Sequence, residues 1–217
     1  MDLKAKFKRF GGEHIDDITQ YLKEYIETNP SVTISVGCDS IQKKRRTVYA
    51  VTIMLHDSDI RRGAHVVFFR ESLVKIRDNF ERLQKEAQFV LDVGNFLEEE
   101  LASFYQRKDL TIAERRRYKW HMIKSVGDYS SAVDEYSIVR NIPLTDIEEK
   151  IEYKLVDLHL DFNPLEAGVN SRGSSSSNKS NLAYKTFVPW LRGMGFRVWS
   201  KPNSHASSSA ADLLVQD

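Results

Sequence analysis

Hydrophobic and polar residues alternate in several short segments of the chain. Residues 156–162 read Val-Asp-Leu-His-Leu-Asp-Phe, and residues 31–38 alternate in the same way. Period-two alternation is typical of a strand that buries one face. Three more short segments have strand composition, at residues 47–56, 64–70 and 196–199. We therefore predict five strands, and the short connections between the first three predict an antiparallel meander.

Other segments carry apolar residues at helical spacing. They predict helices over about residues 15–29, 73–104, 182–191 and from 204 onward. Pro189 is expected to kink or shorten the third of these helices, and Ser204 is expected to cap the last one. On the last helix, His205, Ser208 or Ser209, and Asp212 are predicted to share a face, with Leu213 and Leu214 packing elsewhere.

The polar face of residues 156–162 carries unusual chemistry. Asp157, His159 and Asp161 form a row with about 6.7 Å between neighbours. Asn163-Pro164 ends the segment, so Asp161 is expected at the carboxyl end of the strand, near solvent. Carboxylates in one row repel unless something neutralises them. Two interpretations stay open from these residues alone: a solvated face of an edge strand, or a divalent-metal site.

Composition limits the class of protein. The chain has 217 residues, of which 41% are hydrophobic and 11% aromatic, enough for one large domain, or one domain with an insertion. No apolar run approaches the length of a membrane span and no signal peptide begins the sequence, so we expect no membrane association. The single cysteine, Cys38, excludes an internal disulfide and favours a cytoplasmic location. A net charge of +1 alone argues neither for nor against a nucleic-acid partner.

Basic and aromatic residues are interleaved at residues 114–124. One interpretation is an ordinary solvated helix face. The other is a surface that binds phosphates and stacks bases. The predicted nucleic-acid contacts under the second interpretation are Arg115, Arg116, Arg117, Tyr118, Lys119, Trp120 and Lys124. A shorter basic segment, residues 42–46, is predicted to form the turn between the first two strands.

Several motifs resemble one known superfamily. They are Gly37-Cys38-Asp39-Ser40, Lys85-Glu86, His159-Leu160-Asp161, Gly193-Met194-Gly195-Phe196 and the segment from Lys201 to Asp212. Together with the order of elements, these motifs resemble the ribonuclease-H-like superfamily and, within it, the YkuK-type group of predicted RNase H-like nucleases. The resemblance covers residues 31–99 and 155–217.

The resemblance implies an α/β fold and a domain arrangement. The expected sheet is a ribonuclease-H-like mixed sheet of five strands, a three-strand antiparallel meander plus two parallel strands, flanked by helices. Residues 1–217 would form one domain with a helical N-terminal extension at 1–30. A helical insertion at 105–153 would separate the first core helix from the fourth strand.

The resemblance also implies an active site. In this fold the first and fourth strands are parallel neighbours, so Asp39 and Asp161 would meet at their carboxyl ends. Glu86 and Asp212 would complete a cluster of four carboxylates that are both the catalytic residues and the metal ligands. Such groups within about 5 Å repel by roughly 3 kcal/mol per pair at an effective dielectric of about 20. The implied cofactor is therefore a pair of Mg²⁺ or Mn²⁺ ions.

Other polar residues are expected to surround that cluster. His159 is expected to orient or abut the site, and Asp157, deeper in the strand, to be structural or to lie behind the metal ligands. His205 and Lys201 can steady a phosphate, although a histidine near a helix start is more often a capping or surface residue. Cys38 is expected to point away from the metals into the core.

The activity implied is metal-dependent hydrolysis of nucleic-acid phosphodiester bonds. The alternative from another class is a non-catalytic nucleic-acid-binding or assembly module that keeps the fold without turnover. The expected partner is DNA, RNA or a hybrid, and nothing in the sequence favours one of these or indicates an oligomeric state.

Overall fold

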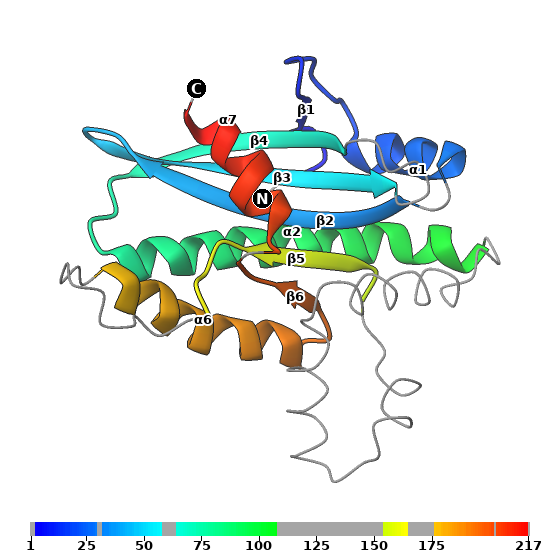
Figure 1. The fold of residues 1–217 in the computed structure, drawn as a ribbon. Helices are drawn as coiled ribbons and strands as arrows, with labels where there is room; N and C mark the ends of the chain where they lie inside the picture. The colour runs from blue at the N-terminus through cyan, green and yellow to red at the C-terminus, as the bar shows by residue number, and fades with distance from the viewer. Residues whose placement is uncertain are drawn as a thin grey trace, which may run out of the picture.

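The computed structural model describes residues 3–29, 32–57, 64–107, 154–164, 176–201 and 203–216. Six strands of this part of the chain form one mixed sheet in the order β1-β4-β3-β2-β5-β6 (Figure 1). The strands are β1 (Lys8–Arg9), β2 (Val32–Gln42), β3 (Arg46–Asp57), β4 (His65–Val74), β5 (Val156–Leu160) and β6 (Arg197–Trp199). β2, β3 and β4 pair antiparallel, whereas β5 pairs parallel with both β2 and β6. The predicted meander with two parallel strands is confirmed.

The prediction of five strands was wrong by one. The additional strand is β1, which pairs antiparallel with β4 opposite Val67 and Phe68. It lies in the N-terminal segment that was expected to be helical, ahead of α1 (Ile18–Thr28). Because an exposed edge strand leaves backbone N–H and C=O groups unpaired, a two-residue strand is enough to cover part of the edge of β4.

A long helix, α2 (Asn79–Arg107), packs across one face of the sheet, beside α6 (Ser176–Gly193). The helix begins later than the predicted residue 73, because β4 continues to Val74 and Asp78 caps the helix. The Asp78 Oδ1 atom accepts hydrogen bonds from the backbone N–H groups of Phe80 and Glu81. Among the described residues, no helix is long and apolar enough to cross a membrane.

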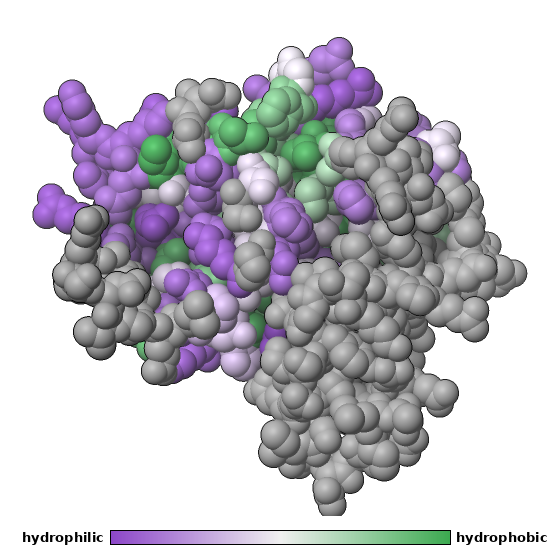
Figure 2. All heavy atoms as spheres, in the orientation of Figure 1, coloured by the Kyte–Doolittle hydropathy of each residue, from purple (hydrophilic) through white to green (hydrophobic). Residues whose placement is uncertain are grey.

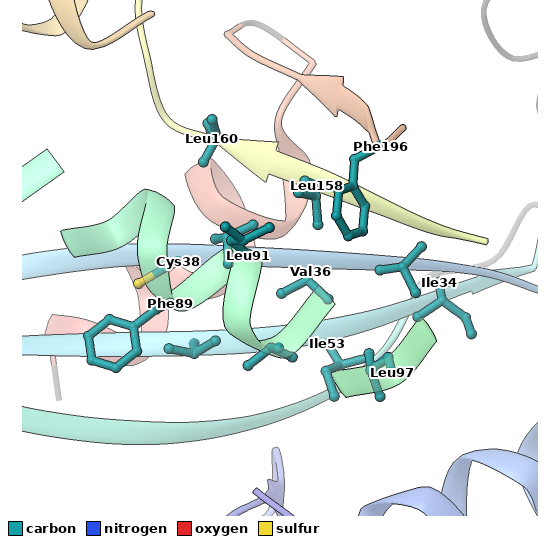
Figure 3. Close-up of a cluster of buried hydrophobic side chains, with 14 of the residues drawn as sticks. Ile34, Val36, Cys38, Ile53, Phe89, Leu91, Leu97, Leu158, Leu160 and Phe196 are labelled. Atoms are coloured by element: carbon teal, nitrogen blue, oxygen red, sulfur yellow. The ribbon is translucent and has the colours of Figure 1, made fainter. Parts of the chain in front are cut away.

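Apolar side chains of β2 and β5 meet those of α2 in the main core. Figure 3 shows this cluster, which includes Val36, Leu158 and Leu97. Cys38 is buried in the same cluster, so it points into the core as expected. All five residues of β5 are buried, and the strand lies between β2 and β6. The interpretation of residues 156–162 as a solvated edge strand is therefore wrong.

The opposite face of the sheet is covered near the middle of β2 by the C-terminal segment. This segment consists of a π-helical turn, η1 (Ala206–Ala211), followed by α7 (Asp212–Gln216). Gly37 lets η1 approach closely, because a Cβ atom at Gly37 would lie 2.4 Å from the carbonyl carbon of Ala206 and the nitrogen of Ser207. The Thr52 hydroxyl on β3 donates a hydrogen bond of 2.7 Å to the Ala206 carbonyl.

Replacing Gly37 with alanine tests this close approach. Backbone atoms cannot yield as the end of a flexible side chain can, so we expect Gly37→Ala to lower the free energy of unfolding by about 1–3 kcal/mol. For a chain of this size the melting temperature should fall by roughly 2–4 °C per kcal/mol, measured by thermal denaturation. Gly193→Ala is the matched control, since a Cβ there would meet nothing within 4 Å. Equal melting temperatures for the two variants would contradict the close approach.

Candidate active site

Two aspartates lie at the carboxyl ends of β2 and β5. In the parallel ladder between these strands, Ile34 pairs with Val156 and Cys38 with Leu160. Asp39 and Asp161 are the next residues on each chain, and neighbouring strands are about 4.8 Å apart. The predicted arrangement of the two strands is confirmed, and their polar ends form one edge of the sheet where ligands of open α/β sheets collect.

Few interactions stabilise the ionised form of the Asp39 carboxyl group. Its Oδ1 atom accepts a hydrogen bond of 2.8 Å from the backbone N–H of Ser40. Burial raises the pKa of Asp39 to about 6, and repulsion from Asp161 and Asp212 adds to this rise, whereas the Ser40 N–H and Arg82 oppose it. The ionised form of Asp39 is therefore costly in the folded protein.

Glu86 comes from α2 and is almost fully buried, with 1% of its surface exposed. Its Oε1 atom accepts hydrogen bonds from the Ser40 hydroxyl at 2.5 Å and from Nη1 of Arg82 at 3.0 Å. Burial raises the pKa of Glu86 to about 8; Arg82 opposes the rise, and the charges of Asp39 and Asp161 add to it. Glu86 thus responds to the charge of both strand-end aspartates.

Asp161 pairs with a lysine that follows β6, forty residues later in the chain. The Lys201 Nζ atom lies 2.9 Å from Asp161 Oδ2, and the Asp161 side chain is 20% exposed. The other oxygen, Oδ1, is buried and has no hydrogen-bond partner among the described residues. Lys201 was expected to steady a phosphate, and the structure places it on a carboxylate of the site instead.

Asp212 reaches the site from the junction of η1 and α7. Its charge contributes to the raised pKa of Asp39. The backbone N–H of Asp212 bonds to the Ser207 carbonyl, the i to i−5 pattern of a π-helix, a form often found at functional sites. Leu213 was expected to pack away from the face of His205, but the wider π-helical turn brings it beside His205 and Ser209. These three residues line a cavity of about 570 Å³ on the sheet face.

The remaining predicted residues lie behind the carboxylates. His159 Nδ1 accepts a hydrogen bond of 3.1 Å from the backbone N–H of Ala206, so this ring fixes the start of η1. Asp157 is buried, 3.8 Å from Nη1 of Arg197 on the neighbouring strand. Ser204 lies directly before the helical residues that begin at His205, the position predicted for it, and its carbonyl accepts hydrogen bonds from the N–H and the hydroxyl of Ser207.

Two residues at the site were not predicted: Arg82 and the hydroxyl of Ser40. Arg82 Nη1 donates to the carbonyl and hydroxyl oxygens of Ser40 and to Glu86. The spacing of Arg82 and Glu86, four residues apart on one helix, was a signal for this pair. The predicted contacts at residues 115–120 and 124 lie outside the described residues, as does the insertion from residue 108 onward.

The four predicted carboxylates influence one another: the charges of Asp161 and Asp212 raise the pKa of Asp39, and those of Asp39 and Asp161 raise the pKa of Glu86. In the part of the chain that the structure describes, no three His, Cys, Asp or Glu side chains converge as ready metal ligands. Two of these carboxylates are paired with cations, Glu86 with Arg82 and Asp161 with Lys201, which offsets part of their mutual repulsion. The donor chemistry still fits a hard divalent cation, since these are carboxylate oxygens and one buried oxygen of Asp161 has no partner among the described residues.

The order and direction of the strands, with α2 across one face, define the ribonuclease H-like fold. Residues 13–114, just under half of the chain, match the family model described as "Ribonuclease H-like". This match supports the ribonuclease H-like superfamily, in agreement with the observed fold. No curated protein and no solved structure matched it. The narrower resemblance to the YkuK-type group continues to rest on the sequence motifs.

The raised pKa values predict how stability depends on pH. Between about pH 4.5 and pH 8, the folded protein binds more protons at Asp39 and Glu86 than the unfolded chain does, because folding raises both pKa values. Stability from these groups is complete below the ordinary pKa values and is lost as the pH rises through the folded ones. We expect Glu86→Gln to remove part of this loss. In metal-free buffer its melting temperature relative to wild type should increase by roughly several degrees from pH 5 to pH 8.5.

The matched control for this experiment is Glu99→Gln, an exposed glutamate on the same helix. Its melting temperature should follow that of the wild type at every pH. A Glu86→Gln curve parallel to wild type across this range would show that Glu86 keeps an ordinary pKa in the folded protein.

Proposed function

We propose that the protein is a divalent-metal-dependent nuclease that hydrolyses phosphodiester bonds in nucleic acid. Asp39, Glu86, Asp161 and Asp212 are its proposed catalytic residues and metal ligands, and two Mg²⁺ or Mn²⁺ ions are the proposed cofactor. The observation that carries the proposal is the mutual repulsion of these carboxylates at one edge of the sheet. The superfamily match supports the same class of activity. The YkuK-type group remains the proposed narrower relationship.

Each residue of the site has a proposed part in the reaction. Asp39 and Asp161, fixed by the β2–β5 register, would hold cations on the sheet edge. Asp212 would close the site from η1, and Glu86 would contribute when Arg82 releases it. The bound cations would supply an activated water and charge stabilisation for the leaving oxygen. Lys201, half exposed, can move from Asp161 to the phosphate as cations enter.

A second candidate function has an observation in its favour. Arg82 and Lys201 already neutralise two of the four carboxylates, as internal cations would in a protein that binds no metal. A nucleic-acid-binding module that has lost turnover would fit this arrangement. The two functions differ in whether divalent ions stabilise the protein and whether nucleic acid is cut.

The first test is binding of the cation. A ligand held only by the folded state stabilises it, so millimolar Mn²⁺ should raise the melting temperature of the wild type. Asp39→Asn should melt higher than wild type in metal-free buffer at pH 8, because it removes a costly charge, and should gain less from Mn²⁺. Asp92→Asn is the control, an exposed carboxylate on α2 whose response to Mn²⁺ should equal that of the wild type. If Asp39→Asn gains as much as wild type, the cation binds elsewhere.

The second test is cleavage. Labelled single-stranded, duplex, hybrid and branched oligonucleotides are incubated with the protein in Mg²⁺ or Mn²⁺ at low salt. Asp39→Asn and Asp161→Asn should each reduce the cleavage rate by roughly 10³-fold or more, and the double variant should be scarcely worse, as for residues that act as a unit. Binding of the same oligonucleotides in EDTA should change little.

Outcomes of the cleavage test separate the candidates. A wild type that binds nucleic acid and cuts none of the panel supports the binding module. Cutting by Asp161→Asn at the wild-type rate would indicate a contaminating nuclease, and Asp92→Asn shows the rate expected of an intact site.

A further inference from the structure

The hairpin between β2 and β3 carries a group of cations beyond the candidate active site. Lys43, Lys44, Arg45 and Arg46 are consecutive, and the last three are exposed. The Lys43 N–H donates to the Arg46 carbonyl at 2.8 Å, which closes the turn with Lys44 and Arg45 at its tip. In Figure 1 this hairpin extends past the other strands at the left, and Figure 2 shows hydrophilic side chains projecting from that side.

Two further cations are tied to the base of the hairpin. Lys75 and Arg77 lie in the connection from β4 to α2. Gln42 Nε2 donates to the carbonyl of Ile76 at 2.8 Å, and the N–H of Ile76 donates to the Thr47 hydroxyl at 3.0 Å. These hydrogen bonds hold the β4–α2 connection against the hairpin. We call the six cations of the two segments the hairpin cation group: Lys43, Lys44, Arg45, Arg46, Lys75 and Arg77.

In the part of the chain that the structure describes, no acid pairs with a member of this group. None of its six members forms an ion pair with a described residue. Of the nearby acids, Glu71 pairs with Lys6, and Asp78 pairs with Lys179 while capping α2. Six like charges without acidic partners among the described residues create a local positive potential, although the whole chain has a net charge of only +1.

The position of the group relative to the carboxylates indicates which anion it suits. β2 runs on from Asp39 to Gln42, about 10 Å at the rise of a strand, and the turn continues to Lys44, so the tip lies within about 16 Å of Asp39 along the strand direction. Successive phosphates of one nucleic-acid strand advance by about 3.4 Å along a duplex. A nucleic-acid strand that lies along β2 with one phosphate at the carboxylates would therefore place another phosphate, within about five nucleotides, at the hairpin tip.

We propose that the hairpin cation group binds the sugar-phosphate backbone of the nucleic acid about five nucleotides from the phosphate held at Asp39 and Asp161. This inference rests on the proposed nuclease function for the position of the reacting phosphate. It adds a second group of cations to the contacts predicted at residues 115–120 and 124. Flexible lysine and arginine side chains on a rigid turn contact phosphates without reading bases, so the group contributes affinity and register rather than sequence specificity.

The experiment compares two double variants that each remove two positive charges. Lys44→Gln/Arg45→Gln alters the hairpin tip. The control, Lys8→Gln/Lys23→Gln, alters β1 and α1, at the far edge of the sheet from β5. Both are made in an Asp39→Asn background, and binding to labelled oligonucleotides is measured in EDTA between ~50 and ~200 mM salt, so that cleavage plays no part. Unchanged melting temperatures establish that both variants are folded.

The tip variant should bind a 20-nucleotide strand with an affinity lower by on the order of 10-fold at low salt. The slope of its log affinity against log salt concentration should be flatter by about 0.7–0.9 for each phosphate that is no longer neutralised. Lengthening the oligonucleotide from about four to about eight nucleotides should raise the affinity of the Asp39→Asn parent and the control more than that of the tip variant. An equal loss of affinity in both double variants would overturn the proposal. Poly-glutamate that displaces the labelled oligonucleotide as effectively as unlabelled oligonucleotide does would also overturn the proposal, because it would indicate an acidic protein partner.

Failure of this proposal is distinguishable from failure of the nuclease function. If the otherwise wild-type protein cuts nothing while the tip variant loses affinity, the hairpin surface stands and the catalytic assignment falls. If the same tip substitutions in the protein that retains Asp39 leave both binding and cleavage at the level of the control, the nuclease assignment stands and the hairpin surface falls.

Discussion

Repulsion between carboxylates that the backbone holds together is the constraint on which the rest of the site depends. The register of β2 and β5 leaves Asp39 and Asp161 at neighbouring strand ends, and no side-chain rotation can carry them far apart. Ser40, Arg82 and Lys201 act as local compensation, each on a different carboxylate. Arg82 and Lys201 are bound to the site only through their side chains, so a more strongly bound cation can displace them. The strand ends are fixed by the hydrogen bonds of the sheet and cannot move. Carboxylates at fixed positions, with counter-charges that can move aside, suit the binding of a metal ion.

A second constraint acts on the other face of the sheet. Gly37, Thr52 and His159 come from three adjacent strands, and all of them contact the backbone at the start of η1. They fix the start of a short C-terminal segment whose later apolar side chains, Leu214 and Val215, pack on β3 and β4. Since Asp212 follows directly after η1, its position depends on these backbone contacts. The absence of a side chain at Gly37 therefore helps to position Asp212, because it lets η1 pack against β2.

Much of the fold could be read from the sequence because the relevant signals repeat. Alternation over residues 31–38 and 156–162 identified two central strands together with the carboxylates at their ends. β1 was missed because a strand of two residues contains no period to detect. The winding of η1 was missed because its Ser- and Ala-rich sequence fits any helix type, and this changed which residues share a face with His205. Glu86 came from family resemblance; the spacing of Arg82 four residues earlier indicated a possible pair, but not that the pair holds a buried carboxylate.

The parallel pairing of β2 with β5 has a consequence for the order of folding. The β2–β3–β4 meander joins segments close in the chain, whereas Ile34 and Val156 pair across more than a hundred residues. Loop closure over such a distance is slow compared with hairpin formation. Asp39 is therefore expected to spend the early stages of folding beside an open sheet edge with no charged neighbour from β5 or α7. The chain acquires its concentrated negative charge only when β5 joins β2, in the same step that buries Leu158 in the core.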